Sequence, residues 1–295
     1  MYPAHQAIQV VDRLDKEDGM KSLEEHLEEF KRIGFTLLPN MLDPDWVQAM
    51  RDAFDEIADR VPNPDGSRSE VFVDVLEHKP DLVLPALQNE RLLDFAEMIV
   101  GPHVQLESVT YRRTAPQDPD TKPVLGFHRD MFAEFPQDGV YHRPLLFNAL
   151  SYMQDLDDEN GPLRIIPGSH MKAVSLTKEE RSQPHPDEVI LYPKAGDTAV
   201  FHNAMVHSGT ANYSQDHRYL FFLTMNHSWL KHRANYSGPV SESVKARARA
   251  TGDRRLLRLL GEDEHFVRRA NSGFMRPDEE AWQEWIAEDA AGLER

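Results

Sequence analysis

Histidine is the residue type whose number and placement in this chain point to chemistry. The 295 residues include 14 histidines and no cysteine, which excludes disulfides, thiolate nucleophiles and iron–sulfur clusters and leaves imidazole as the natural metal ligand or acid–base group. His128 and Asp130 stand two residues apart in the sequence Gly-Phe-His-Arg-Asp. In a strand this spacing directs both side chains to one face, where they can share a metal ion, although such a pair alone is more often a structural hydrogen bond.

A second histidine-containing segment strengthens the metal hypothesis. A Gly-Asp turn at Gly196 and Asp197 precedes an apolar run, then His207, and finally Arg218 in what should be the next strand. Two imidazoles and one carboxylate form the facial triad typical of non-haem Fe(II) sites, which leaves positions open for a chelating cosubstrate and O₂.

The elements that must position these residues begin with helices. Ser22 and Glu25 have the spacing of a capping box, and the helical apolar pattern that follows ends at Gly34. Asp43 followed by Pro44 predicts another helix start. The patterns predict helices over 22–34, 44–61 and 90–100 and strands over 35–38 and 71–75.

From residue 103 to residue 229 the chain instead shows short β-rich runs separated by Pro, Gly and Asp clusters. The runs are 104–113, 145–153, 163–166, 189–192, 198–206 and 219–226. Several short strands with such punctuation indicate a sandwich or barrel rather than alternating βαβ units. We therefore expect one domain over 1–295, with N-terminal helices in 1–102, a catalytic β core in 103–230 and C-terminal helices in 231–295.

Composition excludes several classes of partner. With 33 Lys and Arg against 50 Asp and Glu, the net charge of −17 disfavours nucleic acid and anionic membranes. The sequence contains no apolar run long enough to span a membrane, and its first residues lack the basic start and apolar stretch of a signal peptide. We expect a cytoplasmic protein with a small-molecule partner, neutral or cationic rather than a CoA ester.

Taken together, these motifs resemble the phytanoyl-CoA dioxygenase-like (PhyH) family of Fe(II)/2-oxoglutarate-dependent oxygenases, which includes ectoine hydroxylases. The shared pattern comprises the His-x-Asp motif at His128, the stretch 159–170, the Gly-Asp turn, His207, and Arg218 at the usual distance beyond it. The resemblance covers residues 22–230. It implies a mainly β fold with flanking helices and a double-stranded β-helix (jelly-roll, cupin-like) core.

The resemblance also implies the roles of four residues. His128, Asp130 and His207 would bind the iron. Arg218 would bind the C5 carboxylate of 2-oxoglutarate, for which its planar, permanently charged fork is well suited. His202 competes with His207 as third ligand, but residues five apart on one regular strand face opposite sides. Since the later histidine binds metal in the family, we expect His202 to have a packing role.

The cosubstrate contacts depart from the family in one respect. Family members carry a serine two residues after the distal histidine, where this chain has Gly209. Ser208 or Thr210 could supply the hydroxyl, the latter only through a bulge. On the strand before the His-x-Asp motif, Tyr111 and Arg113 align best with ligand-contacting positions. The expected 2-oxoglutarate contacts are Arg218, Tyr111 and Thr210, and the expected substrate contacts are Arg113, Phe132, Asn148 and Trp229.

The implied activity is a 2-oxoglutarate-dependent dioxygenase that hydroxylates, desaturates or cyclises a small molecule such as one of secondary metabolism. It would use Fe(II) and O₂, with ascorbate as activator, and release succinate and CO₂. Asp130 indicates oxygenation, because related halogenases lack this carboxylate. Two alternatives stay open: a cupin-type metal-dependent hydrolase or isomerase, which would have no use for Arg218, and a catalytically silent small-molecule-binding protein.

Overall fold

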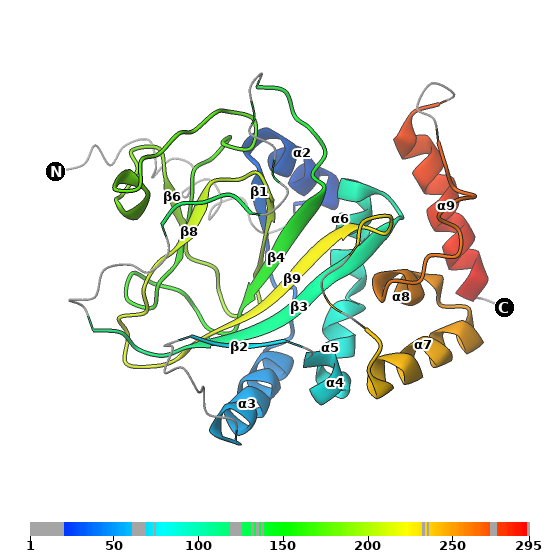
Figure 1. The fold of residues 1–295 in the computed structure, drawn as a ribbon, viewed down its shortest axis with the longest axis horizontal. Helices are drawn as coiled ribbons and strands as arrows, with labels where there is room; N and C mark the ends of the chain where they lie inside the picture. The colour runs from blue at the N-terminus through cyan, green and yellow to red at the C-terminus, as the bar shows by residue number, and fades with distance from the viewer. Residues whose placement is uncertain are drawn as a thin grey trace. The chain divides into compact units, whose positions relative to one another are not determined.

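The computed structural model describes residues 21–60, 69–73, 75–118, 126–130, 133, 136, 139–231, 234, 236–271 and 276–293 (Figure 1). The chain divides into two compact units, which we describe separately. The first contains residues up to 71, 111–144 and 148–222, and the second contains 72–110, 145–147 and the residues from 223 onward. No helix in the described ranges is long and apolar enough to cross a membrane.

The strands form two sheets. The larger sheet has six strands in the order β1 (Phe35–Leu38), β7 (Thr198–His202), β4 (Leu146–Tyr152), β9 (Arg218–His227), β3 (Val104–Thr114) and β2 (Ser69–Phe72). The smaller sheet has the order β6 (Val189–Leu191), β5 (Leu163–Ile165) and β8 (His207–Gly209). Strand β5 pairs antiparallel with both of its neighbours, and β1 pairs antiparallel with β7.

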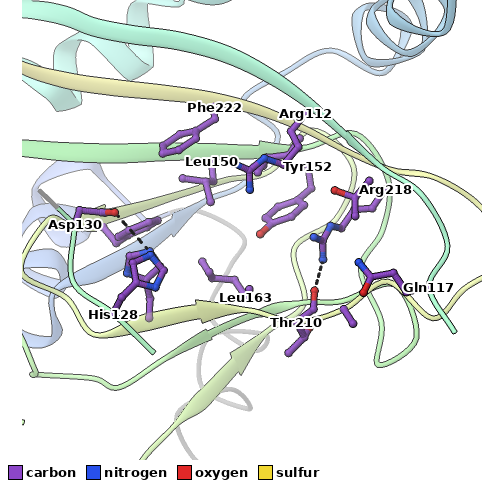
Figure 2. Close-up of a pocket in the computed structure, with 16 residues that line it drawn as sticks. Arg112, Gln117, His128, Asp130, Leu150, Tyr152, Leu163, Thr210, Arg218 and Phe222 are labelled. Carbon is purple, nitrogen blue, oxygen red and sulfur yellow. Dashed lines mark hydrogen bonds and ion pairs between the residues drawn. The ribbon is translucent and has the colours of Figure 1, made fainter. Parts of the chain in front are cut away.

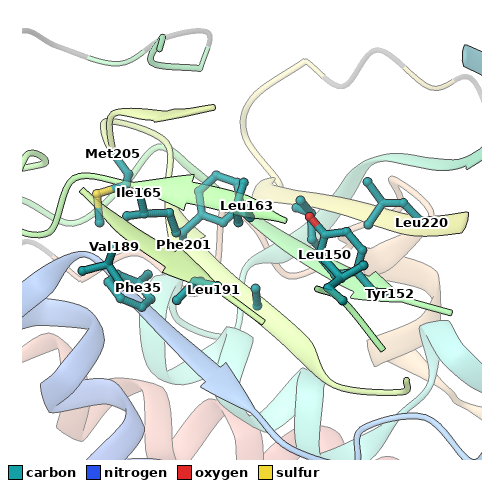
Figure 3. Packing of buried hydrophobic residues seen from close by; sticks show 12 residues of the cluster. Phe35, Leu150, Tyr152, Leu163, Ile165, Val189, Leu191, Phe201, Met205 and Leu220 are labelled. Carbon is teal, nitrogen blue, oxygen red and sulfur yellow. The ribbon is translucent and has the colours of Figure 1, made fainter. Parts of the chain in front are cut away.

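The core of the first unit is an apolar cluster to which both sheets contribute (Figure 3). It contains pairs of residues two apart on four strands: Leu150 and Tyr152, Leu163 and Ile165, Val189 and Leu191, Ala199 and Phe201. Because side chains alternate along a strand, each pair lies on one face, and these inner faces pack against each other. This is the sandwich that the spacing of the β-rich runs predicts.

The predicted capping box is present at the start of α2 (Leu23–Ile33). The Ser22 hydroxyl accepts a hydrogen bond from the Glu25 N–H at 3.3 Å, and the Glu25 carboxylate accepts one from the Ser22 N–H at 2.7 Å. The helix ends at Gly34, which has a φ of 88°. Helix α2 then packs against β1, so the predicted helix–strand opening is confirmed.

The predicted start of α3 (Pro44–Arg60) is confirmed too, since the Asp43 carboxylate accepts the N–H of Asp45 at 2.8 Å. Between β5 and β6 the chain makes a single 3₁₀ turn, η1 (Glu180–Ser182). The strand expected over 71–75 is wrong beyond Phe72, because Val75 begins a helix.

The second unit carries the remaining helices: α4 (Val75–His78), α5 (Pro80–Leu87), α6 (Glu90–Val100), α7 (Pro239–Thr251), α8 (Arg254–Leu259) and α9 (Asp278–Leu293). Helix α6 has the predicted bounds. Helix α5 lies in a stretch for which the sequence patterns predict no element; it begins at Pro80 and contains Pro85, and a proline inside a helix weakens the helical signal.

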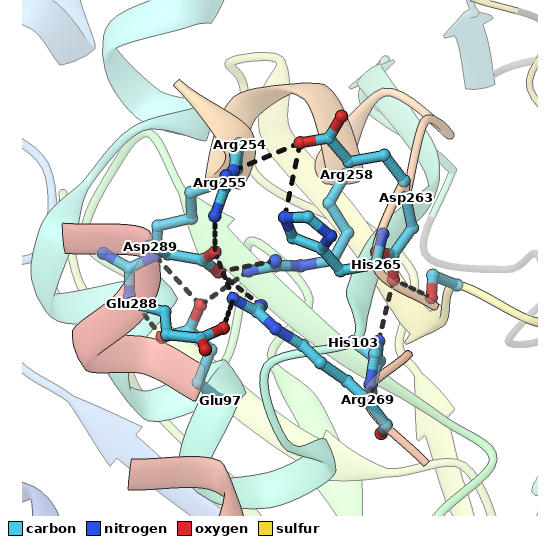
Figure 4. Close-up of polar contacts among 12 residues, drawn as sticks. Glu97, His103, Arg254, Arg255, Arg258, Asp263, His265, Arg269, Glu288 and Asp289 are labelled. Carbon is cyan, nitrogen blue, oxygen red and sulfur yellow. Dashed lines mark hydrogen bonds and ion pairs between the residues drawn. The ribbon is translucent and has the colours of Figure 1, made fainter. Parts of the chain in front are cut away.

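A buried ion network joins α6, α8 and α9 in this unit (Figure 4). The Arg258 side chain, 2% exposed, donates to Asp289 at 2.8 Å and Glu97 at 3.2 Å, and Arg269 donates to Asp289 at 2.8 Å. Burial raises the pKa of Glu97. Burial acts on Asp289 in the same direction, but the guanidiniums of Arg269 and Arg258 hold its pKa below the usual value. Each charge therefore depends on its partners.

Asp263 is a second buried carboxylate of this unit. It accepts a hydrogen bond from the Ser228 hydroxyl at 2.6 Å and lies 2.8 Å from Nδ1 of His103. Burial opposes ionisation, but the hydrogen bonds from His103 and Ser228 outweigh it and lower the pKa of Asp263 to about 2.

We predict that Asp263→Asn destabilises the protein in a pH-dependent way. A carboxyl group whose pKa is lower in the folded state stabilises fully above its unfolded pKa of about 3.9, and this stabilisation disappears as the pH falls through the folded value. The variant should lose about 2 to 3 kcal/mol of unfolding free energy at pH 7. Urea denaturation at several pH values should show the difference shrinking below about pH 4, and a constant difference down to pH 3 would contradict the assignment.

The Gly-Asp turn before β7 depends on the absence of a side chain. Gly196 has a φ of +89°, and a Cβ there would lie 2.5 Å from the Leu42 carbonyl oxygen. The Asp197 carboxylate accepts the N–H groups of Asn40 and Lys194, both at 2.9 Å. The turn thus fastens the segment after β1 to the start of β7.

Gly196→Ala should therefore lower the free energy of unfolding by more than the strain of a left-handed backbone alone would. Gly168 is a matched control, because its φ is +76° but a Cβ there meets no atom within 4 Å. We expect about 1 kcal/mol for Gly168→Ala, from the left-handed backbone, and about 2 to 4 kcal/mol for Gly196→Ala, because the Leu42 carbonyl must also move. Equal losses of stability in thermal or urea denaturation would show that contact between the new Cβ and the Leu42 carbonyl has no energetic cost.

Candidate metal centre and adjoining pocket

The two histidines of the candidate centre are held together through their own backbones. The N–H of His128 donates to the carbonyl of His207, and the N–H of His207 donates to the carbonyl of His128, both at 3.0 Å. Their ring centroids lie 4.4 Å apart. The spacing of His128 and Asp130 suggested a strand, but His128 does not lie in one. An isolated antiparallel bridge to His207 in β8 positions it instead.

Each imidazole is oriented by a carbonyl behind it. Nδ1 of His128 is 3.0 Å from the Gly126 oxygen, and Nδ1 of His207 is 3.1 Å from the Met205 oxygen. A carbonyl can only accept, so Nδ1 carries a hydrogen, and in the neutral tautomer that this selects the Nε2 lone pair is the one available to a metal. Burial lowers the pKa of His207, which favours the neutral, ligating form.

Asp130 completes the cluster. Its N–H donates to the Asn203 carbonyl at 3.0 Å, and one of its carboxylate oxygens accepts a hydrogen bond from the Asn148 amide. The other oxygen lies 3.9 Å from Nε2 of His207. One ligand atom each from His128, Asp130 and His207 lie within 4.8 Å of one another. Two neutral imidazoles and one carboxylate suit Fe(II), so the residues present fit the metal that the sequence implies.

Arg129, between the two ligands of the His-x-Asp motif, points away from the centre and fixes the chain around it. Its guanidinium donates to the carbonyls of Ser169 at 2.7 Å, Lys172 at 3.1 Å and Ala204. Ala204 lies in the turn that leads to His207. Sequence reasoning missed this role, for which the only signal is the position of the arginine inside the motif.

The candidate centre opens into a cavity of about 320 Å³. Figure 2 shows His128 and Asp130 at one end of it and Arg218 and Gln117 at the other. The lining residues are Arg112, Thr114, Gln117, His128, Asp130, Leu150, Tyr152, Leu163, Phe201, His207, Gly209, Thr210, Ala211, Arg218, Leu220 and Phe222. The cavity therefore has polar ends and largely apolar walls, all within the first unit.

Arg218 is anchored by one side of its guanidinium only. Nη1 donates to the carbonyls of Thr210 at 2.9 Å, Asn160 at 3.3 Å and Gly161. A Cβ at Gly161 would lie 2.3 Å from Nη1, so the glycine makes room for this anchoring. Within the described residues Nε and Nη2 have no protein acceptor, which leaves one edge of the fork for a ligand.

Strand β3 presents a different face to the cavity than the sequence suggested. Tyr111 stacks on Phe54 with ring centroids 3.7 Å apart, and Arg113 binds two carboxylates at 2.6 and 2.8 Å. Neither lines the cavity. The alternate residues Arg112 and Thr114 do, because side chains one position apart point to opposite faces.

His202 is separated from His207 by more than strand geometry. The strand expected over 198–206 is confirmed as far as His202 and wrong beyond it, since β7 ends at His202 and β8 begins at His207 in the other sheet. His202 Nε2 donates to the His142 carbonyl at 3.0 Å and Nδ1 accepts the Ala204 N–H at 2.9 Å. Burial lowers the pKa of His202 to about 4. Both nitrogens are occupied, so His202 has the structural position that we expected.

The remaining predicted contacts differ in their placement. Thr210 lines the cavity, but its hydroxyl donates to the Pro162 carbonyl at 2.8 Å. Asn148 contacts Asp130 rather than the cavity. Trp229, in the second unit, stacks on His227 with centroids 4.1 Å apart and is not among the lining residues. Phe132 lies outside the described residues.

Comparison with curated proteins gives a partial match. L-proline trans-4-hydroxylase of Streptomyces griseoviridis is 27% identical over 127 residues. The match covers 34% of this chain and 47% of that enzyme, so it spans about half the length of the relative.

Solved structures match over more of the chain. HygX from Streptomyces hygroscopicus, solved with nickel and 2-oxoglutarate bound, has a TM-score of 0.59 at 19% identity, covering 70% of this chain and 88% of HygX. The epimerase SnoN, solved with Fe³⁺, α-ketoglutarate and nogalamycin RO, has a TM-score of 0.55 at 21% identity, covering 72% and 86%. The carbocyclase SnoK from nogalamycin biosynthesis has a TM-score of 0.55 at 21% identity, covering 73% and 89%.

These likenesses concern the fold, and they confirm the predicted jelly-roll core with flanking helices. The family is shown by the sequence. Residues 30–219 match the model of phytanoyl-CoA dioxygenase (PhyH). Since this match runs from α2 to the start of β9, which is more than half of the chain, the protein belongs to the phytanoyl-CoA dioxygenase family.

Proposed function

We propose that this protein is an Fe(II)- and 2-oxoglutarate-dependent dioxygenase that hydroxylates, desaturates or cyclises a small molecule. One observation carries the proposal: a two-histidine, one-aspartate cluster and an arginine with an unused edge face the same cavity from opposite ends. A molecule with a metal-chelating group at one end and a carboxylate at the other fits this arrangement, and 2-oxoglutarate is such a molecule.

In this proposal His128, Asp130 and His207 hold the iron, and Arg218 holds the far carboxylate of the cosubstrate. When they are bound, iron and 2-oxoglutarate would supply the oxidising chemistry together with O₂, and 2-oxoglutarate would be converted to succinate and CO₂. The chain's own contribution is positioning. Backbone carbonyls fix both imidazoles, Asn148 orients the Asp130 carboxylate, and the apolar cavity walls limit the access of water.

The relatives support a small-molecule substrate. One is a proline hydroxylase, and SnoN and SnoK act in the biosynthesis of nogalamycin. Asp130 favours oxygenation over halogenation, because a carboxylate that binds the iron takes the place that a halide would need. A metal-dependent hydrolase or isomerase is the weaker alternative, since it gives no use to the open edge of Arg218.

The decisive experiment measures succinate. Purified protein is incubated aerobically with Fe(II), ascorbate and 2-oxoglutarate, and a panel of amino acids and polyketide or aminoglycoside intermediates is screened for stimulated succinate release. We expect stimulation by a subset of the panel, with the product heavier by one oxygen or lighter by two hydrogens in mass spectrometry. Binding of Fe(II) without any binding of 2-oxoglutarate would refute the proposal and favour the hydrolase alternative.

For the metal, we predict that His207→Ala and His128→Ala abolish tight binding of Co(II) or Mn(II), because two remaining ligands do not hold the ion. His202→Gln is the matched control, as its nitrogens serve the backbone. It should bind metal within about threefold of the wild type, a difference of well under 1.4 kcal/mol. Calorimetric titration measures all three variants. Retained binding by His207→Ala together with loss in His202→Gln would move the third ligand to His202.

A further inference from the structure

Arg112 is a cavity-lining arginine that the proposed mechanism does not use. It follows from the alternation of β3 that Arg112 points into the cavity while Tyr111 and Arg113 point to the opposite face. In the part of the chain that the structure describes, its guanidinium has no hydrogen bond or ion pair with a protein group. A partly buried, unpaired charge is costly, so its presence calls for a ligand.

Arg112 and Arg218 both lie beside Tyr152, with their guanidiniums on different sides of its ring (Figure 2). Burial raises the pKa of Tyr152, and the charges of both arginines act in the opposite direction. They are close enough for the charge of Arg112 to lower the pKa of Arg218, although burial has the larger effect. Among the described lining residues the one carboxylate is Asp130, which lies at the other end beside the imidazoles. Two like charges in a half-buried site are stabilised by an anion between them.

The hydroxyl groups that could have served this end are directed elsewhere. Thr210 donates to the Pro162 carbonyl at 2.8 Å, and Ser208 donates to the Gly209 carbonyl at 3.3 Å. Gly209 contributes no side chain. The open edge of Arg218, the whole fork of Arg112 and the Tyr152 hydroxyl have no protein acceptor in the described residues, and the neutral amide of Gln117 also lines this end.

We propose that Arg112 and Arg218 hold one carboxylate jointly, with the Tyr152 hydroxyl as an additional donor. Arg112 thereby takes the place of the hydroxyl that is missing at Gly209. The inference rests on the proposed function, in which this carboxylate is the distal one of 2-oxoglutarate. A carboxylate of the substrate would offer the same chemistry, so the test has to separate these two sources.

The test measures equilibrium binding without turnover. Mn(II)-loaded protein is titrated calorimetrically with 2-oxoglutarate and with pyruvate, a 2-oxo acid that lacks the distal carboxylate, in the absence of substrate. Arg112→Gln should bind 2-oxoglutarate at least tenfold more weakly, and pyruvate within twofold of the wild type. Arg218→Gln should show the same selective loss. Arg113→Gln, the neighbouring arginine that pairs with Asp55 and Glu70, should bind both acids like the wild type.

Thermal denaturation of the metal-free variants guards against a folding artefact. Removing an unpaired charge should leave the melting temperature of Arg112→Gln equal to or above that of the wild type, whereas Arg113→Gln should melt lower. If Arg112→Gln keeps its 2-oxoglutarate affinity while Arg218→Gln loses it, the joint site is overturned and the proposed function stands. That outcome would leave a carboxylate of the substrate as the source for Arg112. If the wild type does not bind 2-oxoglutarate, both proposals fall.

Discussion

The reciprocal pair of backbone hydrogen bonds between His128 and His207 is the constraint on which the candidate centre depends. These bonds join a segment without regular structure to the edge strand of the smaller sheet and thereby set the separation of two imidazoles. The N–H of Asp130 donates to the carbonyl of Asn203, which lies in the turn between β7 and β8. Arg129 adds side-chain bonds to the surrounding carbonyls. The ligand geometry is thus set by backbone pairing, which orients the two imidazoles relative to each other.

The cavity combines this rigid end with an equally rigid far end. Arg218 is held by three carbonyls from two loops, and the space for it exists because residue 161 is glycine. Leu150, Leu163 and Phe222 separate the two ends with apolar surface. Binding a ligand at both ends would cost little conformational entropy of the protein, because the fold already orders the groups that contact the ligand.

Sequence reasoning succeeded where local rules decide and failed where contacts distant in sequence decide. The capping box at Ser22 and the bounds of α6 follow from local chemistry, and both are confirmed. The alternation of side chains along β3 also follows from local rules. Which face of β3 meets the cavity, however, depends on the helix that covers its opposite face. Tyr111 therefore stacks on Phe54, and Arg112 lines the cavity instead. The placement of His128 by a bridge to β8 could not be seen either, because the spacing of His-x-Asp carries no information about its distant partner.

The ion network of the second unit constrains how this part of the chain can diverge. Replacing Arg258 or Asp289 alone strands a buried charge, whereas replacing the whole set by apolar residues of similar volume removes the desolvation cost altogether. The effects of these substitutions are therefore strongly non-additive. A substitution at Glu97, Arg258, Arg269 or Asp289 is therefore tolerated best when the partners of that residue change with it.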